Sequence, residues 1–278
     1  MMSLFHKVSQ TCSSITTKEY SSSFSSAIKL LHKDLRNPIY NIYGLVRFAD
    51  EIVDTFHAHD KKLLLQEFKQ ATFDALDRGI SLNPILHSFQ LTANEYAIDR
   101  NLVEAFFKSM EMDLQEHFYT EDVYKEYIYG SAESVGLMCL YVFCEGDKEK
   151  YDQLMPAARS LGSAFQKVNF LRDVKNDHEM LNRTYFPGVD FKNFTPAMKQ
   201  EIEEDIALDF KKAYQGIVRL PWKAKFGVYV AYKYYFSLFN KIKKLQPSRI
   251  MEIRIRIPNY GKAMILLRAG LRNQLNLL

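Results

Sequence analysis

The segment Gln166-Lys-Val-Asn169-Phe-Leu-Arg172-Asp173-Val-Lys-Asn-Asp177 combines a helical hydrophobic pattern with a stripe of polar side chains. At 100° per residue, four of its polar residues fall within about 80° of the helix circumference. These four residues are Gln166, Asn169, Asp173 and Asp177. Apolar residues surround them in the helical projection: Leu161, Phe165, Val168, Phe170 and Leu171. Two carboxylates and two amides on one face suit a hard divalent cation and its ligand.

A second acidic motif, Arg47-Phe-Ala-Asp50-Glu-Ile-Val-Asp54, lies far upstream. Asp50 and Asp54 are spaced i, i+4, so a helix places both carboxylates on one face. Two like charges at this spacing destabilise a helix unless a cation lies between them. Arg47, at i−3 from Asp50, faces the same side. One such motif alone is most often a solvated acidic face, but the two motifs together favour a shared metal site.

Together the motifs predict a magnesium site across a helical bundle, with Mn²⁺ as the alternative ion. The predicted metal ligands are Asp50, Asp54, Asn169, Asp173 and Asp177. Mg²⁺ takes a few carboxylates and completes its coordination with water and phosphate oxygens. A diphosphate would then bind at the mouth of an apolar cavity that encloses a hydrocarbon tail. The predicted chemistry is ionisation to an allylic carbocation, because metal ions and basic groups stabilise departing diphosphate and aromatic faces stabilise the cation.

Length and composition agree with one helical domain over residues 1–278. Of the 278 residues 47% are hydrophobic, while 11 are Gly and 8 are Pro. This excludes a disordered, collagenous or low-complexity chain and disfavours a many-turned all-β fold. The net charge of +4 is too small to indicate nucleic acid as a partner. The three irregularly spaced cysteines form neither a disulfide framework nor a zinc pattern, and they suit a reducing cytosol.

Hydrophobic periodicity predicts about ten helices and no convincing strand. The expected helices cover residues 19–33, 38–57, 61–78, 84–95, 101–112, 121–142, 148–178, 196–218 and 222–245, followed by a basic C-terminal helix. Asn37-Pro38 is expected to break the chain between the first two, because proline lacks the N–H of a helix interior. Arg254-Ile-Arg-Ile is the one strand-like stretch. The N-terminus has no secretory h-region, and the longest apolar stretch, Val135 to Cys144, is about half of a membrane span.

Residues 161–187 resemble the squalene/phytoene synthase family of head-to-head prenyl transferases. Its second signature is reproduced with its spacings by Leu161-Gly162, Gln166, Asn169, Arg172-Asp173, Asp177 and Arg183-Thr-Tyr185-Phe-Pro187. The Arg47 to Asp54 segment is similar to the family's first aspartate-rich motif. The resemblance runs from about Ser9 to Arg268, and it implies an all-α, single-domain isoprenoid-synthase helical bundle with a central cavity.

Weaker resemblances extend the expected site. Tyr20-Ser21-Ser22-Ser23-Phe24 is similar to a serine flap that meets a diphosphate. Met112-Asp113-Leu114, Tyr127 and Ser134-Val-Gly-Leu137 are similar to the family's first signature, from which Ile128 and Glu133 depart. Tyr235 and Arg254 resemble a late tyrosine and arginine of the site. The resemblance thus implies as catalytic Asp50, Asp54, Asp173, Asp177 and Tyr235, and as substrate-binding Ser21, Ser23, Arg47, Tyr127, Gln166, Asn169, Arg172 and Arg254.

The implied reaction joins two prenyl diphosphates through a cyclopropylcarbinyl diphosphate. The motif sequences resemble the carotenoid branch of the family most, and the favoured reading is a phytoene synthase that uses two geranylgeranyl diphosphates, in carotenoid biosynthesis, with no NADPH. A dehydrosqualene or squalene synthase that uses farnesyl diphosphate is the alternative, and squalene synthases end the reaction with a hydride from NADPH. A family member that has lost catalysis and serves in assembly is a third reading, which the presence of all four aspartates disfavours.

The C-terminal third bears on partners and location. Between Lys241 and Arg272 there are nine Lys or Arg and one acid, Glu252. A solvated basic face is the simpler explanation, and a surface that holds anionic lipid is the functional one. The expected partners are therefore prenyl diphosphates, a membrane surface and a downstream desaturase. The expected location is the cytoplasm, with peripheral contact to the inner face of the membrane.

Overall fold

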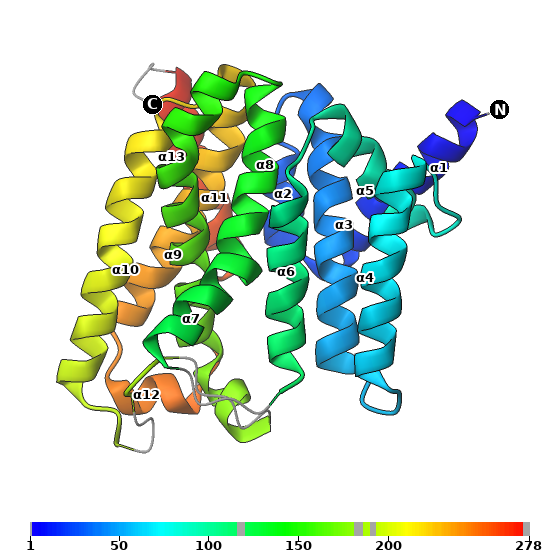
Figure 1. Cartoon of the computed structure of the whole chain (residues 1–278). Coiled ribbons are helices and arrows are strands. Elements are labelled where there is room, and N and C mark those ends of the chain that lie inside the picture. Colours follow the sequence, from blue (N-terminus) through cyan, green and yellow to red (C-terminus); the bar gives the residue numbers. More distant parts are fainter. Residues whose placement is uncertain (1, 116–119, 181–185, 190–192, 275–278) are drawn as a thin grey trace.

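The computed structural model describes residues 2–115, 120–180, 186–189 and 193–274, without the side chains of 175–180 and 274. These residues form helices, and no strand occurs in the described ranges, so the all-α prediction is confirmed. The long helices run roughly side by side as a bundle, and α12 lies across one end (Figure 1). The elements are α1 (Met2–Tyr20), α2 (Ser22–Ile28), α3 (Lys33–Thr55), α4 (Lys61–Arg78), α5 (Pro84–Glu95), α6 (Arg100–Asp113), α7 (Glu121–Ile128), the π-helical turn η1 (Tyr129–Glu133), α8 (Ser134–Cys144), α9 (Lys148–Met180), α10 (Pro196–Ile217), α11 (Trp222–Lys243), α12 (Pro247–Glu252) and α13 (Asn259–Gln274).

Helix α3 is a central helix on one side of the bundle and packs against α1, α5 and α8. Its buried residues recur every three or four positions, as a helix with one inward face requires. They include Leu35, Ile39, Ile42, Leu45, Ala49 and Ile52. Most helix boundaries lie within a few residues of the predicted ones. Helix α4, for example, begins after its N-cap Asp60 and ends before its C-cap Gly79, whose φ is 67°. Helix α3 also carries the Arg47 to Asp54 motif.

The predicted helix over 19–33 is wrong. The chain forms α1 up to Tyr20, breaks at Ser21 and forms the short α2, which ends at Ile28. Ser21 has extended backbone angles, and its Oγ accepts a hydrogen bond from the amide of Phe24 at 3.3 Å. A serine that caps α2 in this way cannot also continue α1, so two helices meet at the serine-rich segment.

The predicted break at Asn37-Pro38 is also wrong. Helix α3 begins at Lys33 and contains Pro38 in its second turn. The proline leaves one backbone carbonyl without its helical donor. Burial of Leu35, Pro38 and Ile39 on the same helix outweighs that loss, and the helix continues unbroken into the acidic motif.

Helices α7 and α8 form one run that is interrupted by the π-helical turn η1. Gly130, in this turn, lies against α6: a Cβ there would come within 2.4 Å of the Ala105 carbonyl oxygen. The absence of a side chain therefore lets the two helices approach closely. By length and hydropathy the run Glu121–Cys144 could cross a membrane, but 50% of its most apolar window is buried inside the fold. Core helices share that property.

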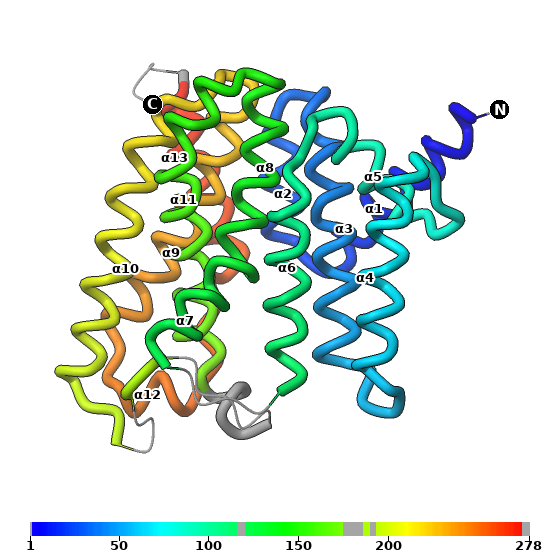
Figure 2. The backbone as a smooth tube through the Cα atoms, in the orientation of Figure 1, coloured from blue at the N-terminus to red at the C-terminus, as the bar shows by residue number. Residues whose placement is uncertain are grey.

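The C-terminal region turns back along the bundle. After α11 the chain forms α12, which the hydrophobic pattern did not predict, and then passes through 253–258 without regular secondary structure. The strand-like Arg254 to Ile257 stretch therefore forms no strand. Helix α13 then packs along α11. It is the red segment, largely hidden behind the front helices in the tube drawing (Figure 2).

Candidate active site

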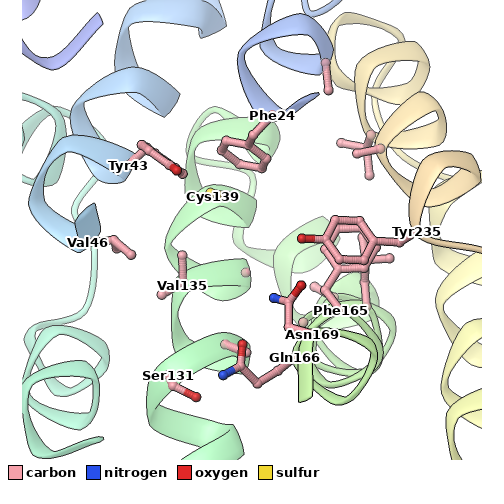
Figure 3. A pocket seen from close by; sticks show the side chains of 18 of the residues that line it. Phe24, Tyr43, Val46, Ser131, Val135, Cys139, Phe165, Gln166, Asn169 and Tyr235 are labelled. Carbon is pink, nitrogen blue, oxygen red and sulfur yellow. The ribbon is translucent and has the colours of Figure 1, made fainter. Parts of the chain in front are cut away.

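A cavity of about 670 Å³ lies among α2, α3, α8, α9 and α11. This volume is within the range of small-molecule sites. Most of the interior lining is apolar, and the carboxylates and arginines come from α3, the end of α6, α9 and the segment after α12. Figure 3 shows Tyr43 and Val46 on one side of the cavity and Asn169, Gln166 and Tyr235 on the other. Polar side chains on the α9 and α11 side of the cavity therefore face the α3 side across a mainly apolar interior.

The α3 wall carries Arg47, Asp50 and Asp54, as the motif predicted. Arg47 forms an ion pair with Glu51, one turn along the helix. The guanidinium also lies 4.3 Å from the centre of the Tyr20 ring, where it makes a cation–π contact. The Nε of Arg47 is buried and forms no hydrogen bond within the described residues. This donor is available to an anionic ligand.

Asp50 is held in an unfavourable charge environment. Burial and repulsion by Asp54 raise the pKa of Asp50 to about 8, and Arg47 offsets only part of this effect. The carboxylate of Asp113 adds to the repulsion. The α3 wall is therefore short of positive charge, and a divalent cation would relieve the deficit.

The α9 wall carries Asn169, Arg172 and Asp173. Arg172 Nε donates to Asp173 Oδ2 at 3.0 Å, and Arg254 Nε lies 2.8 Å from Asp173 Oδ1 as an ion pair. Burial alone would lower the pKa of Arg172, but its hydrogen bond to Asp173 and the carboxylate's charge outweigh burial and raise the pKa. Two guanidinium groups thus meet at one carboxylate in the cavity wall.

Tyr235 lies beside this wall, on α11. Its ring stacks on Phe165, with 3.9 Å between ring centres. Burial raises the pKa of Tyr235, while the charge of Arg172 and a hydrogen bond from Asn169 act in the opposite direction. The phenol therefore stays protonated at neutral pH, in contact with the polar end of the cavity.

Two lining residues were missed as site candidates. Tyr127 OH donates to Asp113 Oδ2 at 3.0 Å, so Asp113 belongs to the acidic cluster near Asp50. The sequence feature that could have identified Asp113 was its position in the Met112-Asp113-Leu114 signature. Tyr43 also lines the cavity and is hydrogen-bonded to Ser21. Its signal was spacing: Tyr43, Arg47 and Asp50 follow one another at i, i+4 and i+7 on α3.

The structure brings most of the predicted residues to this cavity. The lining includes Ser21, Arg47, Asp50, Asp54, Tyr127, Gln166, Asn169, Arg172, Asp173, Tyr235 and Arg254. Ser23 is half-buried on α2 and is not among the lining residues. The side chain of Asp177 lies outside the described part of the chain, as do Arg183 and Tyr185.

The donors that are described fit a hard divalent cation. The Asn169 Oδ1 atom is buried and accepts no hydrogen bond from the described residues, and Asp50 and Asp54 repel each other on the α3 wall of the same cavity. Neutral and anionic oxygens of this kind are the ligands that Mg²⁺ prefers. In the part of the chain with described side chains, which omits Asp177, no three His, Cys, Asp or Glu side chains are grouped tightly enough to hold a metal by themselves.

An all-α bundle around an apolar cavity, with acidic and basic groups at its polar end, is consistent with the fold of the helical isoprenoid synthases. The squalene/phytoene synthase family model matches residues 17–260. The chain therefore belongs to the squalene/phytoene synthase family, which consists of head-to-head prenyl transferases.

Individual relatives fall on more than one branch. The chain is 28% identical to a 4,4'-diapophytoene synthase of Staphylococcus haemolyticus, over 73% of this chain and 70% of that protein. It is 27% identical to a 15-cis-phytoene synthase of Paracoccus, over 82% of this chain and 80% of that protein. In fold it is similar to a solved dehydrosqualene synthase, with a TM-score of 0.82, 18% identity and coverage of 97% and 98% of the two chains.

Proposed function

We propose that this protein is a phytoene synthase that condenses two geranylgeranyl diphosphates head to head. The observation that carries the proposal is the arrangement of the cavity, in which Asp50 and Asp54 on α3 and Asn169 and Asp173 on α9 line one apolar space. This arrangement supports a diphosphate at the polar end and prenyl chains inside. The proposed first step breaks the C–O bond of one substrate, and the diphosphate leaves with the electron pair.

The proposed metal site consists of Asp50, Asp54, Asn169 and Asp173, with Asp177 added from the motif. Mg²⁺, or Mn²⁺ in its place, supplies positive charge for the leaving diphosphate. Arg47, Arg172 and Arg254 donate hydrogen bonds to the diphosphate oxygens in this proposal, since planar guanidinium groups match such oxygens in pairs. Asp50 must lose its proton to act as a ligand, and a cation beside it lowers its raised pKa.

The apolar interior has two proposed tasks. It excludes water from the carbocation, which water would otherwise capture. It also presents aromatic faces, including Phe24, Phe165 and Tyr235, to the positive charge. The double bond of the second substrate then attacks the cation, a proton leaves, and a cyclopropylcarbinyl diphosphate forms. A second ionisation, rearrangement and loss of a proton complete phytoene without a reductant.

The motif sequences around Arg47 and Asp173 support the carotenoid branch of the family, and phytoene synthase with its C20 substrate is the member of that branch that we propose. The alternative is a dehydrosqualene or squalene synthase that uses farnesyl diphosphate. The sequence relatives support both readings alike, with 28% identity to a diapophytoene synthase and 27% to a phytoene synthase. A non-catalytic assembly role is disfavoured because Asp50, Asp54 and Asp173 all remain at the cavity.

The deciding experiment incubates the purified protein with Mg²⁺ and either the C15 or the C20 diphosphate, and identifies the hydrocarbon by mass spectrometry. Phytoene from the C20 substrate, at a higher kcat/KM than any C30 product, is the expected result. A C30 product at higher kcat/KM establishes the alternative. No hydrocarbon from either substrate supports the non-catalytic reading. The proposed setting is the cytoplasm beside the inner membrane face, with a desaturase as the next enzyme for the hydrocarbon.

A further inference from the structure

Helix α13 has two apolar faces, and the fold covers only one of them. Its inward face packs on the core through Ile265 and Ala269, and Ala269 is 2% exposed. The opposite face carries Tyr260, Met264, Leu267 and Leu271, which are 80%, 47%, 59% and 51% exposed. At 100° per residue these four side chains lie within about 60° of arc, on the side opposite Ala269. They form a continuous apolar stripe, called the outer stripe below.

The segment that carries the outer stripe has charges of one sign only. Residues 253–278 contain five Lys or Arg and no Asp or Glu. Arg268 is exposed beside the stripe, and Arg272, at the same end of the helix, is hydrogen-bonded to Tyr229 of α11. A helix with apolar residues outward and basic residues at its flank is the pattern of helices that lie in a membrane interface.

We infer that the outer stripe of α13 docks the protein on an anionic lipid bilayer. The stripe would enter the boundary between headgroups and acyl chains, while the exposed Arg268 beside it meets lipid phosphates. A second copy of this chain fits the same face less well. A two-fold symmetric contact would bring the arginines of both helices together, and neither helix supplies an acidic partner.

The position of α13 connects this surface to the cavity. Lys262 Nζ lies 3.5 Å from Ser22 Oγ, next to the cavity-lining Ser21, and 5.7 Å from the centre of the Tyr234 ring. Helix α13 therefore begins beside the α2 edge of the cavity. If the proposed function holds, a docked α13 places this edge near the lipid that accepts a water-insoluble product. The docking itself does not depend on that function.

The test measures co-sedimentation of the full chain with vesicles, in the absence of substrate. One set is an equimolar mixture of phosphatidylcholine and phosphatidylglycerol, and the other is phosphatidylcholine alone. Wild type is expected to bind the anionic set more strongly. Leu267→Glu should lower that binding about tenfold or more, since it removes buried apolar surface and adds a repelled charge. Arg268→Gln should lower it about fivefold on the anionic set and leave binding to the neutral set unchanged.

Leu82→Glu is the matched control, because Leu82 is 92% exposed between α4 and α5, away from α13. It should bind vesicles like wild type. All three changes are at exposed positions, so circular dichroism spectra and melting temperatures should match those of wild type. Equal vesicle binding by wild type and Leu267→Glu overturns the inference, as does a wild type that binds neither set. A dimer in size-exclusion chromatography that Leu267→Glu dissociates also overturns it and assigns the stripe to a second copy.

Discussion

Arg254 Nε lies 2.8 Å from Asp173 Oδ1 and thereby joins the irregular segment after α12 to the α9 wall of the cavity. Asp173 also accepts a hydrogen bond from Arg172, so one carboxylate orients two guanidinium groups. Guanidinium groups fixed in this way bind planar or tetrahedral anions with little further loss of side-chain entropy. We therefore expect the pair to bind an anion, such as the proposed diphosphate, at the polar end of the cavity.

Replacement of Arg254 by Lys tests this arrangement. The charge stays, but the paired donors are lost, so kcat/KM should fall about tenfold or more. Arg254 is 43% exposed, and such a pair contributes only about 0–1 kcal/mol to stability, so the melting temperature should barely change. Arg268→Lys, on the exposed side of α13, is the control and should keep wild-type kinetics. Equal kinetics for both variants would remove Arg254 from the substrate site.

The acidic motifs are tested by Asp50→Asn and Asp173→Asn. Each variant keeps the shape of the side chain and removes a proposed metal ligand, so turnover should fall by a factor of about 10³ or more. Folding should survive, as circular dichroism would show. Asp152→Asn, an exposed position on α9, should retain full activity. Near wild-type turnover by either cavity variant contradicts the proposed metal site.

The raised pKa of Asp50 predicts how the metal-free protein responds to pH. In the folded chain the pKa is about 8, against an ordinary value of 3.8, so between these values the folded state keeps a proton that the unfolded state has lost. The stability of the wild type should therefore decrease as pH rises through this window. Asp50→Asn carries no charge there and avoids that loss.

Thermal melts of chelator-treated proteins provide the measurement. The stability advantage of Asp50→Asn over wild type should be near zero at pH 4 and largest above pH 8. Asp152→Asn should show no such widening. Added Mg²⁺ should raise the melting temperature of wild type more than that of Asp50→Asn, since only wild type has the full ligand set. A constant difference between wild type and Asp50→Asn at every pH would contradict the raised pKa.

The close contact at Gly130 gives a prediction about the fold. A Cβ there would meet the Ala105 carbonyl oxygen at 2.4 Å and the Ser109 Cβ at 2.7 Å. Gly130→Ala should therefore reduce the free energy of unfolding by about 1–3 kcal/mol, because backbone atoms must move apart. Gly270→Ala, in α13 with nothing within 4 Å of the added Cβ, should be neutral or stabilise by up to about 1 kcal/mol. Denaturant unfolding of both variants measures the difference.

Termination of the reaction distinguishes the branches of the family. Phytoene formation ends with loss of a proton, so the rate of product formation should be the same with and without NADPH. The measurement is hydrocarbon yield over time under both conditions, with the C15 and C20 substrates in parallel. A strict requirement for NADPH, with a saturated central bond in the product, would place the protein on the squalene branch instead.

The sequence alone determined the fold class and most of the charged residues of the cavity. Helical periodicity is local: hydrogen bonds within each helix and one apolar face per helix establish where α4, α5, α6 and α10 lie. The i, i+4 spacing likewise placed Asp50 and Asp54 on one face of α3 before any packing was known. These features depend on residues a few positions apart, which is why they can be predicted from the chain.

Only the tertiary structure determined the features that depend on contacts between residues remote in sequence. The break at Ser21 and the unbroken passage through Pro38 result from how α1, α2 and α3 bury their faces, which local propensity does not reveal. The pairing of Arg254 with Asp173, the repulsion of Asp50 by Asp113 and the outward position of Leu267 likewise require the packed bundle. Contacts of this kind form between residues remote in sequence, so their physical cause is the shape of the assembled core rather than any short stretch of the chain.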